Sequence, residues 1–192
     1  MAKVSIGFSS PKTWKPLAEL IKLVGGTKYS HTFVSWRDPR IERRKVFEAV
    51  GSGIRILSNI TFKKNAKIIE LYQFEVSDQK LIEIERIAHN MAGSPYGYTA
   101  LVGIAVIKSF NYINDLLGIK GKQERNIFSD GNSSNVCIES AARVLFCILE
   151  KPLPDDIESY DLLDYEKLVK EYGIKVSQSK VDKINGETSK KK

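Results

Sequence analysis

Cysteine and histidine are scarce in this sequence, which has 192 residues and only two of each. Cys137 and Cys147 fall on one expected helix, where ten residues of rise separate them by about 15 Å. A disulfide needs Cα atoms within about 7 Å, so these two cannot pair, and the sequence is not a secreted disulfide framework. The four residues also lack CxxC or HxxxH spacing, which argues against a zinc site. We expect no metal and no cofactor.

Long hydrophobic runs are missing too. The longest apolar run, residues 100–107, is far shorter than the ~20 residues that cross a bilayer. The apolar stretch within Met1 to Phe8 is too short and too interrupted to be that of a signal peptide. We therefore expect no transmembrane segment and a protein that is cytoplasmic at synthesis. Release by lysis or by a virion would be needed for a substrate outside the cell.

Nucleotide and nucleic-acid motifs are also absent. Gly51-x-Gly53 lacks the rest of a phosphate-binding loop, and no helix-turn-helix, zinc-finger or RNP motif predicts sequence-specific nucleic-acid binding. Positive charge is present, with a net charge of +7, of which +3 comes from five lysines and two acids in residues 180–192. A second basic cluster comprises Arg37, Arg40, Arg43, Arg44 and Lys45. Both are either solvated surface or a weak contact with an anionic partner.

The order of expected elements predicts an α+β domain with a mostly antiparallel sheet packed against helices. Alternating patterns predict strands over residues 3–9, 29–36, 45–50 and 67–75, with 54–57 as a possible continuation. Helical spacing predicts helices over residues 14–24, 78–92, 99–117, 137–149 and 159–172, with a loop over 118–132. Asp78 is the expected N-cap of the second helix. Residues 1–175 form the expected domain, and 176–192 are expected to be a basic, disordered tail.

Cys137 is the candidate nucleophile. Polar residues stop just before it and an apolar helical pattern begins there, so Ser134 or Asn135 is the expected N-cap. A thiol in the first turn of a helix lies at the positive end of the helix dipole, which favours its thiolate. The alternative is that Cys137 is a core residue, as helical cysteines often are. Core packing is the expectation for Cys147.

His31 and Glu48 are the candidate partners of that thiol. A Cys and a His far apart in sequence are the minimum set for a thiol nucleophile with its base. Glu48 lies in the middle of the next apolar strand, where a carboxylate needs a partner. If the two strands pair, Glu48 accepts a hydrogen bond from one imidazole nitrogen and the other nitrogen faces Cys137. The alternatives are a structural histidine and a glutamate on a solvent face.

The order of these residues resembles a known family. The motifs that carry the resemblance are Tyr29-Ser30-His31-Thr32-Phe33-Val34, Phe47-Glu48-Ala49 followed by glycines, Gly93-Ser94-Pro95-Tyr96-Gly97-Tyr98, Asn135-Val136-Cys137-Ile138-Glu139-Ser140, and Pro154 with Asp161-Leu162. They are similar to circularly permuted NlpC-like papain-fold hydrolases, which include YiiX/YebB-like proteins and, more distantly, lecithin:retinol acyltransferase-like enzymes. Ile138 stands where that family has a serine. The similar region spans residues 4–163.

The resemblance implies a permuted papain-like fold with Cys137 as nucleophile at a helix N-terminus, His31 as base and Glu48 as the orienting residue. It implies acyl chemistry through a thioester, with no metal or cofactor. The first hypothesis is a cysteine hydrolase that cleaves an amide bond in a peptide or peptidoglycan-like substrate. The second is an acyltransferase or thioesterase that acts on lipid at a membrane surface. The third is a catalytically silent binding or structural protein.

Overall fold

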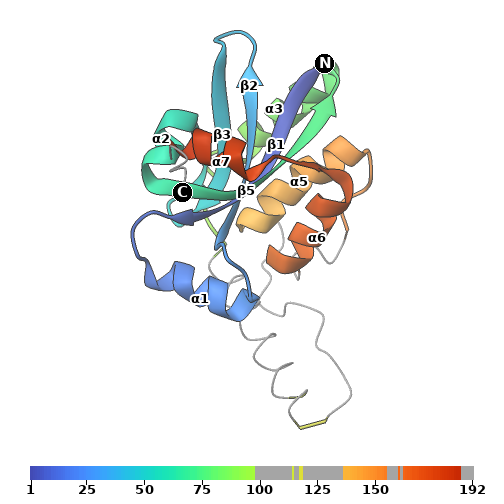
Figure 1. Cartoon of the computed structure of the whole chain (residues 1–192). Helices are drawn as coiled ribbons and strands as arrows, with labels where there is room; N and C mark the ends of the chain where they lie inside the picture. Colours follow the sequence, from blue (N-terminus) through green and yellow to red (C-terminus); the bar gives the residue numbers. More distant parts are fainter. Residues whose placement is uncertain (98–113, 115–116, 119–135, 155–159, 161, 187–192) are drawn as a thin grey trace.

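The computed structural model describes residues 1–97, 114, 117–118, 136–154, 160 and 162–186, and they form an α+β fold (Figure 1). A six-stranded sheet has the order β4-β3-β2-β1-β5-β6, and every neighbouring pair is antiparallel. The elements are β1 Ala2–Pro11, α1 Pro16–Gly25, β2 His31–Asp38, β3 Arg43–Val50, β4 Gly53–Ser58, α2 Asn59–Asn65, β5 Ala66–Val76, α3 Asp78–Met91, α5 Cys137–Leu149, α6 Leu162–Tyr172, β6 Ile174–Lys175 and α7 Gln178–Asn185. The α+β class and the antiparallel sheet are as expected.

The central strand β1 sets the register of the sheet. It pairs with β2 and with β5, placing Ser9 opposite His31 and Ser5 opposite both Ser35 and Gln73. Residues directly opposite in an antiparallel pair share one face of the sheet. Gly7 is required in this strand, because a Cβ there would overlap the ring of Phe33.

The first face of the sheet holds the main hydrophobic core. Alternate residues of β1, among them Val4, Ile6 and Phe8, are fully buried in one cluster with side chains from α3, α5 and α6. Helix α5 is the most buried of these helices, as its apolar sequence requires. It contacts β2 and β3 directly, which are the strands that carry His31 and Glu48.

The second face is covered by α2 and α7, which the sequence analysis did not predict. Phe62 of α2 and Val181 of α7 are buried with Phe33, Ile68 and other residues in a second cluster. The prediction of a disordered tail from residue 176 is thus wrong over residues 176–186. Helix α7 is short and carries few apolar residues, yet burying Val181 against the sheet stabilises it. Residues 187–192 lie outside the described part.

Two expected helix caps are corrected. The N-cap of α3 is Ser77, whose hydroxyl accepts from the Lys80 N–H at 3.0 Å, and Asp78 is the first helical residue. The N-cap of α5 is Val136, whose own N–H donates to the Glu139 carboxylate at 3.0 Å. Ser134 and Asn135 lie outside the described residues, as do the helix expected over 99–117 and the loop over 118–132 apart from residues 114, 117 and 118. Among the described helices, none is long and apolar enough to cross a membrane.

Candidate active site

His31 and Glu48 lie side by side on neighbouring strands. His31 is the first residue of β2 and Glu48 lies within β3, and 2.9 Å separates the His31 Nε2 atom from the Glu48 Oε2 atom. The carboxylate of Glu48 is buried, with 4% of its surface exposed. The hydrogen bond expected from strand pairing is therefore present. The alternative, a glutamate on a solvent face, is not what the structure has.

Arg55 holds the second oxygen of the same carboxylate. It lies on β4 directly opposite Glu48, and its Nε and Nη2 atoms donate to Glu48 Oε1 at 3.0 and 2.7 Å. A guanidinium that donates two N–H groups fixes a carboxylate in orientation as well as in charge. Glu48 thus has one oxygen bound by Arg55 and the other available to His31. Sequence reasoning missed Arg55, although its strand was expected, because nothing local indicates its cross-strand partner.

Cys137 is the first residue of α5, and its thiol lies close enough to the His31 ring to raise the pKa of that histidine. Because Nε2 is engaged by Glu48, the ring nitrogen that remains for the thiol is Nδ1. Two hydrogen bonds hold the first turn of α5. The Val136 N–H donates to the Glu139 carboxylate, and the Ser140 hydroxyl donates to the Val136 carbonyl at 3.1 Å. The structure therefore brings the three residues singled out in the sequence together, with His31 between Glu48 and Cys137.

The imidazole of His31 is held in its protonated form. Burial by itself lowers its pKa, but the hydrogen bonds and charges of Cys137 and Glu48 outweigh burial and raise the pKa of His31 to about 10. A neighbouring negative charge favours the charged form of a histidine. A protonated imidazole beside a thiol is the arrangement by which thiol enzymes activate their nucleophile.

Glu48 is held in its ionised form for a related reason. Burial raises its pKa, whereas the hydrogen bonds and positive charges of His31 and Arg55 lower it, and the net direction is downward. A buried carboxylate keeps its charge only when it is paired in this way. Its negative charge remains available to orient the imidazolium over the whole neutral range.

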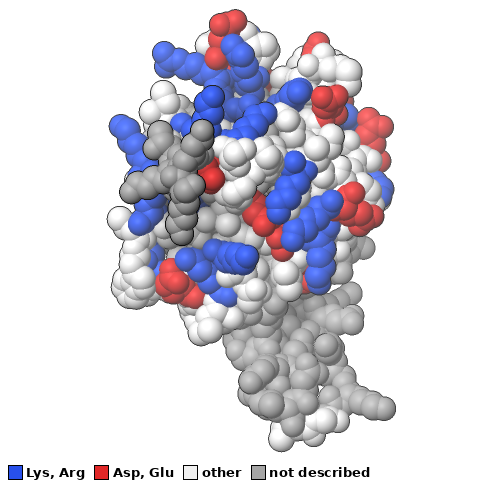
Figure 2. Space-filling model, in the orientation of Figure 1, with Lys and Arg blue, Asp and Glu red and all other residues white. Residues whose placement is uncertain are grey.

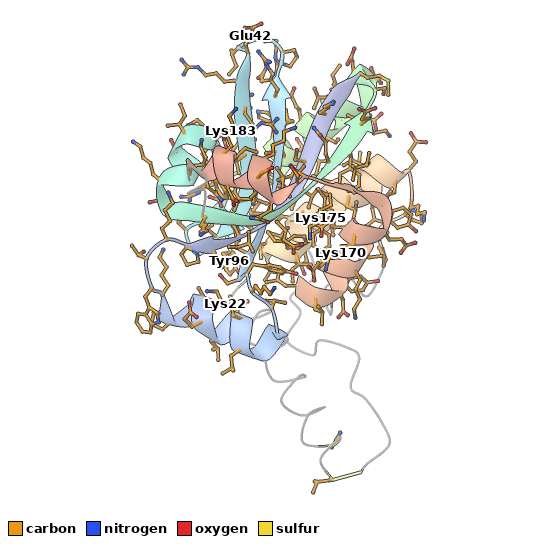
Figure 3. The ribbon with its side chains drawn as sticks, in the orientation of Figure 1. Lys22, Glu42, Tyr96, Lys170, Lys175 and Lys183 are labelled. Carbon is orange, nitrogen blue, oxygen red and sulfur yellow. The ribbon has the colours of Figure 1, made fainter. Side chains whose placement is uncertain are left out.

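A cavity of about 420 Å³ opens beside His31 and Glu48. One wall is α1, through Leu17, Ala18 and Ile21, and Tyr96, which is labelled above α1 in Figure 3, also lines the cavity. Ser9 lines the same cavity, with 1% of its surface exposed and no hydrogen-bond partner for its hydroxyl among the described residues. Sequence reasoning missed Ser9, since a serine in a strand carries no chemical signal. A substrate in this cavity would lie against His31.

The arrangement contains the groups that a thiol nucleophile needs: a thiol, a histidine beside it and a carboxylate that orients the histidine. A sulfur that has lost its proton is the attacking form, and the histidine beside it is oriented by a third residue. The described residues contain no group of three or more potential metal ligands from His, Cys, Asp and Glu. The second cysteine, Cys147, is set apart from this arrangement: burial and the nearby Glu83 raise the pKa of its thiol.

Neither a known family model nor a curated protein matches the sequence. The chemistry assigned to the site therefore depends on its geometry: a carboxylate hydrogen bonded to an imidazole, both lining an open cavity, with a thiol that raises the pKa of the imidazole.

Proposed function

We propose that this protein is a cysteine hydrolase of the permuted papain-like type, which cleaves an amide bond in a peptide or cell-wall peptide. The single observation that carries the proposal is the position of His31, which is hydrogen bonded to Glu48 and whose pKa is raised by the neighbouring Cys137 as well as by Glu48. A structural histidine has no need of both a buried, arginine-bound carboxylate and a cysteine at the first residue of a helix. Together these groups have the roles of nucleophile, base and orienting residue.

The reaction would proceed through a thioester. The Cys137 thiolate attacks the carbonyl carbon, and the C–N bond breaks as the His31 imidazolium gives its proton to the leaving amine. Water then attacks the thioester while His31 takes one of its protons. The C–S bond breaks, the acid product leaves and the thiolate is regenerated. Glu48 stays ionised throughout and stabilises the imidazolium.

The oxyanion of each tetrahedral intermediate needs hydrogen-bond donors. The first N–H groups of a helix have no acceptor within the helix, and Cys137 and Ile138 are the first two residues of α5. The backbone N–H of Cys137 is thus the donor closest along the chain to the attacking sulfur. We assign it to the oxyanion in this proposal.

Alkylation by iodoacetamide at pH 5.5 tests the site without knowledge of the substrate. We expect Cys137 to be alkylated at this pH while Cys147 is not, as measured by peptide mass spectrometry, because only a thiolate reacts. A compact reagent is needed since only 6% of the surface of Cys137 is exposed. Cys147 is the internal control in the same chain, because it is less buried and yet held as a thiol.

Removal of His31 gives the decisive comparison. In a His31→Ala variant that keeps the circular dichroism spectrum of the wild type, alkylation of Cys137 at pH 5.5 should fall to the rate of Cys147. Unchanged alkylation of Cys137 would contradict the thiolate–imidazolium pair. It would favour the hypothesis of a binding or structural protein in which Cys137 is merely packed.

Helix α1 favours a second candidate, an acyltransferase or thioesterase that acts on lipid at a membrane surface. Leu17 of α1 lines the cavity, and Trp14, Leu20 and Leu23 beside it are exposed by 75, 49 and 81% of their surfaces. Exposed lysines flank these side chains at positions 12, 15 and 28. A surface that combines exposed apolar side chains with positive charge binds to anionic bilayers.

Co-sedimentation with vesicles of phosphatidylcholine and phosphatidylglycerol tests this second candidate. We expect the wild type to sediment with the vesicles at low salt and a Leu20→Ser, Leu23→Ser variant to remain in the supernatant. Ile60→Ser, which changes an exposed apolar residue on α2, is the matched control and should sediment like the wild type. Failure of the wild type to sediment would rule out this candidate and leave the amide hydrolase.

A further inference from the structure

A second cavity, of about 230 Å³, lies beneath α7, on the face of the sheet that α2 and α7 cover. Its polar lining comes from strands and from both helices on this face: Ser5, Ser35, Arg44, Asn59, Gln73 and Lys180. None of the described residues that line it is an aspartate or glutamate. It shares no lining residue with the cavity at His31. It is therefore independent of the proposed active site.

The register of the sheet builds a polar row along one side of this cavity. Ser5 lies opposite both Gln73 and Ser35, so the three side chains share one face across three strands. Arg44 extends the row, since its Nη1 atom donates to the Ser35 hydroxyl at 3.3 Å. Ser5 and Ser35 are 2% and 3% exposed. Two buried hydroxyls beside the half-buried amide of Gln73 are unfavourable beneath a covering helix unless they have partners.

Arg44 is a partly buried cation without a carboxylate partner among the described residues. Arg40 binds Asp38 and Glu85, and Arg55 binds Glu48, whereas the one polar contact of Arg44 is a neutral hydroxyl. Burial and the positive charge of Arg37 both lower the pKa of Arg44. A desolvated guanidinium in this position is unfavourable unless an anion joins it.

Lys180 supplies a second positive charge from α7. It lines the cavity and has no ion pair among the described residues. Figure 2 shows lysine and arginine side chains gathered over the same side of the molecule, around the ends of β2 and β3 and near α7. Charges of one sign around a cavity raise the local concentration of the opposite ion.

We propose that this cavity binds a small oxyanion, a phosphate group, held by Arg44 and Lys180 and by the hydroxyl and amide donors of the polar row. A guanidinium presents N–H groups in a fork that matches two oxygens of a phosphate. Lys180 contributes a point charge, and Ser5, Ser35, Asn59 and Gln73 can donate to the remaining oxygens. The bound anion would supply the counter-charge that Arg44 lacks.

Binding is measured by isothermal titration calorimetry of the full chain at constant ionic strength, in chloride. Three probes distinguish the source of the phosphate group: inorganic phosphate, adenosine monophosphate, and phosphatidylcholine vesicles that contain phosphatidic acid. We expect saturable binding of at least one probe. Arg44→Gln and Lys180→Gln should each raise its Kd about tenfold, as expected for the loss of one charge-assisted hydrogen bond of ~1.4 kcal/mol.

Neighbouring residues provide matched controls. Arg43→Gln and Lys183→Gln remove the same charge one and three positions away, from exposed side chains that do not line the cavity (Lys183 is labelled in Figure 3). They should leave the Kd within twofold. Equal weakening by test and control variants, or no saturable binding of any probe, would overturn the proposal. If Arg44→Gln does not fold, Lys180→Gln decides it, since Lys180 is exposed.

Discussion

His31 links the chemistry of the site to the stability of the protein. Its pKa is raised from 6.5 to about 10 in the folded state, against the effect of burial, by Cys137 and Glu48. A group whose pKa is higher in the folded state than in the unfolded state binds its proton more tightly when folded, and this stabilises the fold. The stabilisation is complete at pH values below the unfolded pKa and is lost as pH rises through the folded pKa. The stabilisation from His31 is thus complete below about pH 6.5 and is lost by about pH 10.

The pH dependence of thermal unfolding tests this link. We expect the difference in Tm between the wild type and His31→Gln to shrink steadily as pH rises from 6 to 10, measured by circular dichroism. A Cys137→Ser variant retains the Glu48 partner but lacks the sulfur that helps to raise the pKa of His31, so its dependence on pH should be weaker than that of the wild type. A difference in Tm that stays constant over this range would contradict the protonated state assigned to His31.

Arg55 affects the stability of the fold through its hydrogen bonds to Glu48. The pKa of Glu48 is lowered in the fold by His31 and Arg55, against burial. A carboxylate with a lowered pKa contributes stability above its unfolded pKa, and this contribution is lost as pH falls through its folded pKa. Replacing Arg55 removes part of that contribution, so we expect Arg55→Gln to have a lower Tm than the wild type at pH 7.

This deficit should disappear in acid, where Glu48 is protonated in both proteins. The measurement is Tm from pH 7 to pH 2. Arg37→Gln is the control, because Arg37 forms only an exposed pair with Glu42 at 3.7 Å and such pairs contribute little. A deficit of Arg55→Gln that is equal at pH 7 and pH 2 would show that the guanidinium does not act through the Glu48 charge.

At the scale of elements, α7 is attached to β5 by one side chain. The Asn185 Oδ1 atom accepts from the Ile68 N–H at 3.0 Å, and its Nδ2 atom donates to the Ile68 carbonyl at 2.8 Å. The amide thus pairs with the strand backbone as a neighbouring strand would. Lys63 of α2 adds a hydrogen bond to the Ile184 carbonyl at 2.9 Å. These bonds explain why a polar helix lies fixed on the sheet.

Truncation of this side chain should be measurable. Asn185→Ala leaves a partly buried backbone donor and acceptor without partners, so we expect a loss of about 1–3 kcal/mol in the free energy of unfolding, measured by urea denaturation. Gln178→Ala on the same helix removes only an exposed contact with Asp182 and should change stability by less than about 0.5 kcal/mol. Equal effects of the two substitutions would contradict the attachment.

At the scale of the whole molecule, one sheet separates two hydrophobic cores. The larger core lies under α3, α5 and α6 and supports Cys137, and the smaller lies under α2 and α7. Arg44 and the phosphate site proposed for it belong to the second side. The C-terminal helix is therefore part of the fold and not an appendage.

A chain that ends at Val176 tests this organisation. It would expose Phe33, Phe62 and Ile68, which Val181 helps to bury, and the burial of one valine is itself worth about 1.5–3 kcal/mol. We expect the shortened chain to have a lower Tm and to bind the dye ANS more strongly than the full chain. Identical Tm values would contradict a structural role of α7.

The sequence alone determined the elements whose patterns are long and regular. Alternation in β1, β2, β3 and β5 and helical spacing in α1, α3 and α6 are local properties, so they predict strands and helices and hence an α+β fold. It also predicted the hydrogen bond between His31 and Glu48, because a carboxylate within an apolar strand needs a partner and the neighbouring strand offers a histidine.

Only the tertiary structure decided the rest. Helices α2 and α7 are too short for a periodic signal and exist because the second face of the sheet buries Phe62 and Val181. Arg55 reaches Glu48, and Arg44 lies beneath α7, through strand register and helix packing that no local pattern encodes. Residue chemistry can be read along the chain, whereas the partners that set its charge state are brought together by the fold.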